Sequence, residues 1–317
     1  MWERGREAGL QSRPGNTSDR AADWQGDFLR AERLPPSYLD TARAFFDPLA
    51  AQLADRAARV SGALLVAVNG SQGSGKSTLC AYLVAALAQR HGLRGATLSL
   101  DDFYLTRAAR QRLAAEVHPL LATRGVPGTH DTALLQATLR ELRHGRSGAR
   151  LVPAFDKARD DRAPESTWSR HALPLDVVLL EGWCVGARAE APRALARPVN
   201  RLEREQDPQA RWRRFSNDCL RRDYEPLWDA FDCWVMLRAP SFEQVLAWRT
   251  EQEEKLADRV GGRGEGLMDA AALRRFVEHF ERQTRRCLDD LPDRVDILLQ
   301  LDAQRRVVAG RGLGAAP

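Results

Sequence analysis

A glycine-rich octapeptide is the segment whose residue types and spacing most clearly predict chemistry. Gly70-Ser-Gln-Gly-Ser-Gly-Lys-Ser77 satisfies the pattern GxxxxGK[ST] and follows a short apolar run. In this pattern backbone N–H groups converge on a phosphate at a helix N-terminus, while the lysine reaches the β- and γ-phosphates and the serine hydroxyl ligates Mg²⁺. We therefore expect a nucleoside triphosphate site. The residues expected to bind the nucleotide are Gly70, Ser71, Gly73, Ser74, Gly75, Lys76, Ser77 and Thr78.

Three carboxylates end predicted strands and could act beside this loop. Asp101 and Asp102 follow one short apolar run, and Glu181 follows another. The carboxyl ends of parallel strands meet at the edge of the sheet where ligands bind. One aspartate can accept the proton of an attacking hydroxyl while the other caps the next helix. We assign the proton-accepting role to Asp101, although the sequence leaves open which of the two aspartates is the base. The expected catalytic residues are Lys76, Asp101 and Glu181, and the expected metal ligands are Ser77 and Glu181.

Cations gather in the predicted loops between the second and third strands, where an acceptor molecule would bind. The expected acceptor-binding residues are Asp101, Tyr104, Arg124, His130, Asp156, Lys157 and Arg162, with Asp131 and Asp160 beside them. An arginine grips a carboxylate with a bidentate fork, and a lysine acts as a point charge. The group suits a small carboxylate-bearing acceptor better than a nucleobase, which would require stacking aromatic rings. Each charge could instead be a solvated loop residue, and His130 could equally anchor its loop.

The composition excludes several classes of function. The chain has 317 residues, of which 44% are hydrophobic and 29% charged, which favours a globular protein of one large domain or two small ones. Its longest apolar run, 79–88, is shorter than the ~20 residues that a bilayer requires, so we expect no membrane partner. The net charge is +5, but the arginines are interspersed with acids, so we do not expect nucleic-acid binding. The sequence has neither an NKxD guanine motif nor an LSGGQ-like transporter signature.

The cysteines and the N-terminus predict a reducing compartment. Five cysteines stand far apart without a CxxC pair, and the first residues lack an apolar signal segment. We therefore expect reduced thiols in a cytoplasmic protein. The cysteines are Cys80, Cys184, Cys219, Cys233 and Cys287.

Strands and helices must alternate along the chain to position these residues. Short apolar runs predict strands at 63–68, 96–100, 176–180, 232–237 and 295–301. Helical spacing of apolar residues predicts helices at 37–58, 76–90, 106–117, 131–143, 208–230, 241–258 and 269–290. This alternation favours an α/β fold, a parallel sheet of about five strands with helices on both faces.

The expected organisation is a poorly ordered arm followed by a single domain. Polar, proline-broken residues 1–36 predict the arm, and 37–310 the domain, whose N-terminal helix occupies 37–59. Residues 144–175, rich in proline, glycine and charge, are expected to form an irregular acceptor-side loop region. The segment 241–268 could form a lid, with Arg249 reaching the phosphates of ATP.

Four motifs make a specific resemblance. The chain resembles the phosphoribulokinase, uridine kinase and pantothenate kinase superfamily, in which an Asp-x-Phe follows the second strand and an apolar run ends in Glu-Gly. Within that superfamily the chain is similar, from Leu34 to Val307, to the D-glycerate 3-kinase family. The motifs that carry this similarity are Ser99-Leu-Asp-Asp-Phe-Tyr-Leu-Thr106, Val117-His-Pro-Leu-Leu-Ala-Thr-Arg-Gly-Val-Pro-Gly-Thr-His-Asp131, Pro153-Ala-Phe-Asp-Lys157 with Asp160-Asp161-Arg162, and Glu181-Gly-Trp-Cys-Val-Gly186.

The resemblance implies a P-loop kinase that uses ATP and Mg²⁺. It matches Asp101 to the catalytic acid of the family and Glu181 to its Walker-B-type acid. It implies transfer of the γ-phosphoryl of ATP to D-glycerate, or a similar small hydroxy acid, giving 3-phosphoglycerate. The alternatives are a nucleoside or pantothenate kinase of the same superfamily, and a P-loop ATPase with a regulatory or nucleic-acid role. The sequence leaves the oligomeric state open.

Overall fold

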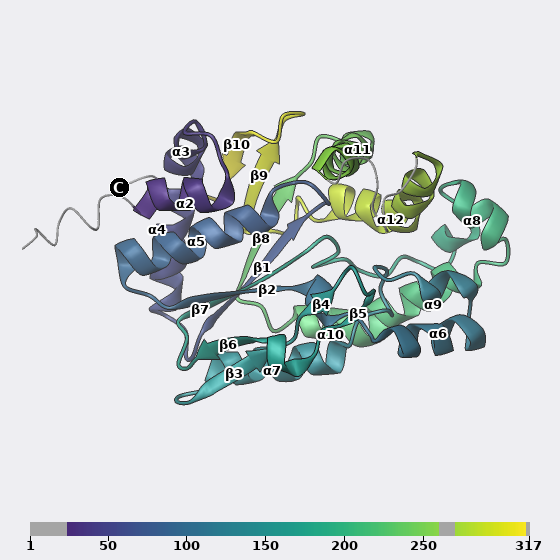
Figure 1. Ribbon diagram of the computed structural model, residues 1–317, viewed down its shortest axis with the longest axis horizontal. Coiled ribbons are helices and arrows are strands. Elements are labelled where there is room, and N and C mark those ends of the chain that lie inside the picture. The colour runs from purple at the N-terminus through teal and green to yellow at the C-terminus, as the bar shows by residue number, and fades with distance from the viewer. Residues whose placement is uncertain (1–23, 260–269, 315–317) are drawn as a thin grey trace, which may run out of the picture.

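A six-stranded sheet forms the centre of the computed structural model, which describes residues 24–259 and 270–314 (Figure 1). The strand order is β10-β9-β8-β1-β7-β2. Five strands are parallel, as predicted, and β10 is an antiparallel edge strand that the sequence analysis did not predict. The strands are β1 (Leu64–Gly70), β2 (Gly95–Ser99), β7 (Val177–Gly182), β8 (Cys233–Arg238), β9 (Ile297–Leu301) and β10 (Val307–Arg311).

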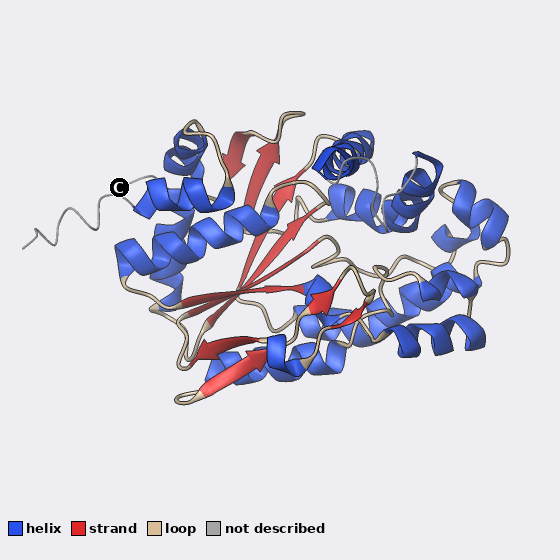
Figure 2. Cartoon of the chain, in the orientation of Figure 1, coloured by secondary structure: helices blue, strands red, loops and turns tan. Residues whose placement is uncertain are grey.

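Helices cover both faces of this sheet, with α4 and α5 on one side and α7 and α10 on the other (Figures 1 and 2). The predicted helices agree with the structure to within a few residues, although π-helical turns at 42–46 and 220–224 interrupt two of them. The helices are α2 (Trp24–Glu32), α3 (Tyr38–Thr41), α4 (Asp47–Ala57), α5 (Lys76–His91), α6 (Arg107–Glu116), α7 (Thr132–His144), α8 (Arg201–Gln206), α9 (Arg211–Cys219), α10 (Glu225–Trp228), α11 (Phe242–Arg259) and α12 (Ala270–Asp290). Within the described residues, no helix is long and apolar enough to cross a membrane.

The prediction of a poorly ordered arm over residues 1–36 is wrong for part of this segment, because residues Trp24–Glu32 form helix α2. The rings of Trp24 and Phe28 lie 5.4 and 5.3 Å from the ring of Tyr82 on α5. Gln25 donates a 2.8 Å hydrogen bond to the Tyr82 hydroxyl. Two aromatic rings one helical turn apart thus pack on the domain. The sequence analysis did not predict this contact, because the segment as a whole is polar. Residues 1–23 lie outside the described residues.

The middle region 144–175 is more regular than predicted. Strands β3 (Ala149–Val152) and β6 (Ser169–Ala172) pair in one antiparallel sheet, and β4 (Phe155–Asp156) and β5 (Asp161–Arg162) pair in another. Figure 2 shows both small sheets beside the central one. The β4–β5 hairpin carries three of the expected acceptor-side residues, Asp156, Lys157 and Arg162. Of the possible lid segment 241–268, residues 260–268 lie outside the described residues.

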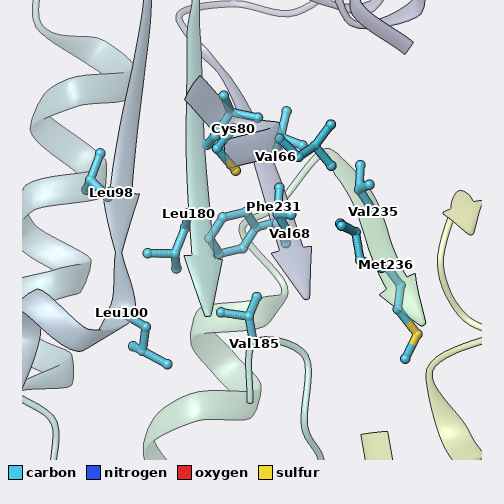
Figure 3. Packing of buried hydrophobic residues seen from close by; sticks show 14 of the residues in the cluster. Val66, Val68, Cys80, Leu98, Leu100, Leu180, Val185, Phe231, Val235 and Met236 are labelled. Carbon is cyan, nitrogen blue, oxygen red and sulfur yellow. The ribbon is translucent and has the colours of Figure 1, made fainter. Parts of the chain in front are cut away.

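The apolar core lies around the central strands. Every residue of β1 and of β7 is buried, which explains the apolar runs with which both strands begin. Figure 3 shows Val66 and Val68 of β1 between Leu180 and Val235 of the neighbouring strands, with Cys80 of α5 above them. All five cysteines are buried, as free thiols. Burial raises the pKa of each thiol, to about 11 for Cys219 and about 12 for Cys233 and Cys287.

Candidate active site

The glycine-rich loop joins the end of β1 to the start of α5, which is the arrangement that the motif requires. Gly73 and Gly75 adopt φ values of 76° and 86°, in the left-handed region that glycine populates without strain. Lys76 is the first residue of α5. The hydroxyls of Ser71 and Ser74 are buried and have no hydrogen-bond partner among the described residues. A phosphate group in the loop would supply these hydroxyls with acceptors.

Glu181 lies beside this loop because β7 is the neighbour of β1, with Glu181 in register with Val68. The Ser77 hydroxyl donates a 2.9 Å hydrogen bond to Glu181 Oε1. Lys76 Nζ lies 3.6 Å from Glu181 Oε2, a buried oxygen that accepts no hydrogen bond within the described part of the chain. The three side chains therefore meet as the sequence predicts.

This donor set fits Mg²⁺. The ion prefers carboxylate and hydroxyl oxygens and usually retains several waters beside substrate phosphates. The Ser77 hydroxyl and the Glu181 carboxylate are such ligands, already in contact, and Glu181 Oε2 is free to accept a further partner. These two residues would hold the ion next to the phosphates.

Asp101 lies at the end of β2 and contacts two acceptor-side groups. The Tyr104 hydroxyl donates a 2.8 Å hydrogen bond to Asp101 Oδ1, and Lys157 Nζ lies 2.8 Å from Oδ2. Burial opposes ionisation of this carboxyl, but the charge and hydrogen bond of Lys157, with the charge of Lys76, lower its pKa to about 2. Asp101 is thus a carboxylate held in a fixed orientation.

Asp102 has a different environment from its neighbour. Its carboxylate accepts a 3.1 Å hydrogen bond from the backbone N–H of Phe155, the first residue of β4. Burial and the adjacent charge of Asp101 raise the pKa of Asp102 to about 6. Asp102 therefore anchors the hairpin that carries Lys157, and Asp101 is the member of the pair that faces the cavity.

A cavity of about 550 Å³ connects the phosphate loop with the acceptor side. It is lined by five of the eight residues that the sequence analysis expected to bind the nucleotide, and by Asp101, Tyr104, Arg124 and Lys157 of the expected acceptor site; Gly70, Ser71 and Ser74 do not line it. The described residues that line it are Gln72, Gly73, Gly75, Lys76, Ser77, Thr78, Asp101, Tyr104, Arg124, Lys157, Trp183, Arg249, Glu251, Phe276, Phe280 and Arg305.

Three residues expected to bind the acceptor do not line this cavity. Arg162 donates to a carboxylate oxygen of Asp131 at 3.0 Å and to the carbonyl of Tyr104 at 3.2 Å. Asp156 accepts hydrogen bonds from backbone N–H groups of its own hairpin turn. His130 is buried and stacks on the Tyr104 ring at 4.6 Å, and burial lowers its pKa to about 4. These contacts give all three residues a supporting position.

The sequence analysis missed the far wall of the cavity. Arg305, in the turn between β9 and β10, donates a 2.9 Å hydrogen bond from Nε to the carbonyl of Gly73. Its Nη2 lies 2.6 Å from a carboxylate oxygen of Glu251 on α11. Arg249, considered above as a lid residue, lies over the ring of Phe276. No motif in the sequence identifies Arg305, because its partner Gly73 lies more than 200 positions earlier.

Comparisons with known proteins place this site in a family. The model of the phosphoribulokinase / uridine kinase family matches residues 65–188, which include the loop, Asp101 and Glu181. An uncharacterized kinase of Schizosaccharomyces pombe, mug58, is 31% identical over 231 residues, 69% of this chain and 79% of that protein. The chain belongs to the phosphoribulokinase/uridine kinase family. It is therefore a kinase, a phosphotransferase with an alcohol group as acceptor.

Two relatives of this kinase carry the name D-glycerate 3-kinase. The chloroplastic protein of Arabidopsis thaliana is 30% identical over 266 residues, 77% of this chain and 54% of that protein. The solved structure of D-glycerate 3-kinase from Cryptococcus neoformans is similar with a TM-score of 0.70 and 26% identity, over 84% of this chain and 99% of that one. The likeness to this solved structure confirms the predicted fold class.

Proposed function

We propose that this kinase transfers the γ-phosphoryl group of ATP to D-glycerate, giving 3-phosphoglycerate, with Mg²⁺ as the metal ion. The observation that carries the proposal is the position of Asp101 and Lys157 in the same cavity as the phosphate loop. The two relatives named D-glycerate 3-kinase support the choice of acceptor.

In the proposed reaction Asp101 orients the attacking hydroxyl and takes up its proton. Phosphoryl transfer passes through a loose transition state, so the hydroxyl requires positioning more than prior deprotonation, and a carboxylate with a low pKa is sufficient. Tyr104 and Lys157 hold the two oxygens of Asp101 in place. Lys76 stabilises the charge of the transferring group. Ser77 and Glu181 would hold Mg²⁺, which would neutralise negative charge on the phosphates of ATP.

The carboxylate of D-glycerate would bind at Arg124 and Lys157, the two cations on the acceptor side of the cavity. Both already contact carboxylates of the chain, Lys157 with Asp101 and Arg124 with Asp160. An acceptor that carries its own carboxylate can share these cations, and a neutral acceptor cannot. We therefore expect discrimination by charge as well as by shape.

A panel of acceptors with ATP and Mg²⁺ tests the proposal. We expect D-glycerate to support ADP formation with a kcat/KM at least tenfold higher than uridine or pantothenate, which corresponds to ~1.4 kcal/mol. ³¹P NMR of the product distinguishes the 3-phosphate from the 2-phosphate. Equal rates with glycerol or glyceraldehyde would show that the carboxylate is not recognised, and ADP release without any acceptor would favour an ATPase.

A nucleoside kinase is the second candidate, because aromatic rings line the cavity. Trp183, Phe276 and Phe280 line it, and the centroids of the Trp183 and Phe280 rings lie 4.9 Å apart in an edge-to-face arrangement. A nucleobase could stack on such rings. The adenine of ATP could use the same surfaces. Faster turnover with uridine than with D-glycerate would support this candidate.

A further inference from the structure

Arg110 is a buried arginine on α6 that binds three acceptor-side segments without lining the cavity. Arg110 is 1% exposed. The guanidinium donates from Nε to the carbonyl of Leu105 at 3.3 Å and from Nη1 to that of Ala122 at 2.6 Å. Its Nη2 donates to the carbonyl of Asp160 at 2.6 Å and lies 3.0 Å from a carboxylate oxygen of the same residue. One side chain thereby joins the segment after β2, the turn before Arg124 and the β4–β5 hairpin.

Asp160 is shared between two arginines. One oxygen of its carboxylate faces Arg110, and the other pairs with Nη1 of Arg124. Arg124 lines the cavity, and its guanidinium lies over the Phe155 ring at 5.5 Å. Asp160 adopts a φ of 53°, in the left-handed region, where its backbone carbonyl also accepts from Arg110. The residue is thus held in an uncommon conformation by the arginine behind it.

The charges of this cluster do not cancel. Two guanidinium groups and one carboxylate leave a net charge of +1, and the member that faces the cavity is Arg124. The neighbouring Asp161 accepts hydrogen bonds from the backbone N–H groups of Arg107 and Arg162, and these bonds, with the charges of Arg110 and Arg107, lower its pKa. Without Arg110, Asp160 would neutralise Arg124 alone.

We propose that Arg110 is a positioning residue that selects an anionic acceptor by drawing the charge of Asp160 away from Arg124. The proposal rests on the proposed function, which supplies the carboxylate-bearing acceptor. It assigns a role in substrate choice to a side chain that does not touch the substrate. The two guanidiniums act through the carboxylate between them, so the effect of each depends on the presence of Asp160.

The test is a charge rescue. Arg110→Met should weaken D-glycerate binding about tenfold or more, measured by calorimetry and as KM, while the Kd for ATP changes less than twofold. Asp160→Asn in the Arg110→Met background should recover most of that loss, because Arg124 regains an unneutralised charge. Arg110→Lys should lose less than Arg110→Met, since it retains the charge but not the fork.

Arg213→Met is the matched control. Arg213 is also buried and binds backbone carbonyls and a carboxylate, those of Leu195 and Asp207, away from the cavity. Its loss should lower the melting temperature without a selective loss of D-glycerate binding.

The outcomes separate the two proposals. A double variant that binds D-glycerate more weakly than Arg110→Met overturns the charge argument, because a purely structural role predicts a further loss. An Arg110→Met variant that folds, binds ATP and keeps its D-glycerate affinity also overturns it. If Arg110→Met does not fold, Arg110→Gln, which also removes the charge but keeps hydrogen-bond donors for the three carbonyls, gives the same comparison with and without Asp160→Asn. A wild-type protein that binds D-glycerate without phosphorylating it contradicts the proposed function alone, and one that does neither contradicts both.

Discussion

Two adjacent aspartates have opposite environments in this kinase. Asp101 faces two hydrogen-bond donors in the cavity, and Asp102 faces a backbone N–H of the hairpin behind it. Consecutive side chains leave the backbone in different directions, so a two-residue motif can supply one group to the reaction and another to the scaffold. The sequence shows that both acids exist, but not which partner each one meets.

Replacement of the two aspartates should separate these roles kinetically. Asp101→Asn should lower kcat by about 10²–10⁴-fold with little change in the KM for ATP, because the group that takes up the proton is lost. Asp102→Asn should cost much less, since an amide oxygen can still accept the N–H of Phe155. Steady-state ADP release checks both variants. The larger loss in Asp102→Asn would reverse the assignment.

The same pair should make opposite contributions to stability as the pH changes. The pKa of Asp101 is lowered from 3.8 to about 2, so its stabilisation is complete above pH ~4 and is lost as the pH falls through 2. The pKa of Asp102 is raised from 3.8 to about 6, so the fold loses stability as the pH rises from about 4 through 6. The melting temperature of Asp102→Asn should rise relative to that of the wild type between pH 4 and 7. The melting temperature of Asp101→Asn should stay below that of the wild type by a nearly constant amount from pH 5 to 7.

Lys76 provides the sharpest test of the phosphate loop. Lys76→Ala should reduce kcat at least 10²–10³-fold, because the charge that faces the transferring group is removed. Lys76→Arg should also fail, since the broad fork does not fit the cradle. Arg90→Ala, on the last turn of the same helix, is the control, because Arg90 pairs with Asp47 away from the cavity. Near-normal turnover in a folded Lys76→Ala variant would refute the assignment of the loop.

At the scale of elements, the spacing of apolar residues predicted the strands and helices that have a regular pattern. It missed the short strands, whose sequences have no such pattern. Buried apolar runs predicted all five parallel strands, and strand order then brings Glu181 beside Ser77. The hairpins of the middle region have short, polar strands, which carry no periodic signal. The edge strand β10 has one buried residue followed by four exposed ones, so its sequence lacks the pattern of a buried strand.

The turn between β9 and β10 should tune nucleotide binding. Arg305 contacts the phosphate loop through Gly73 and contacts α11 through Glu251, and it lies over the Trp248 ring at 5.3 Å. Arg305→Ala should raise the KM for ATP several-fold and leave the KM for D-glycerate nearly unchanged, because the loop would lose a tether on its nucleotide side only. A rise confined to the acceptor KM would contradict this position. Arg306→Ala is the matched control, since the side chain of Arg306 pairs with Asp302 in the exposed turn.

At the scale of the whole molecule, one continuous core connects the sheet with helices from both ends of the sequence. Residues of β1, β7 and β8 belong to one buried cluster with residues of α4, α5 and α12. The N-terminal α2 adds its aromatic rings to Tyr82. The site therefore lies where segments from most of the chain converge, which is why single-residue spacing could identify its phosphate side but not all of its walls.

The rates at which the five buried thiols are alkylated should measure local unfolding in different parts of this kinase. They are distributed over α5, the segment after β7, α9, β8 and α12, and none is exposed. A thiol reagent attacks the thiolate, so each site can be alkylated only when its surroundings open and its pKa returns toward the ordinary value. Mass-resolved labelling should therefore proceed at five rates that rank local opening across the fold. Saturating nucleotide should slow Cys80, behind the phosphate loop, more than Cys233 on β8; equal slowing of both would mean that the molecule opens as one unit.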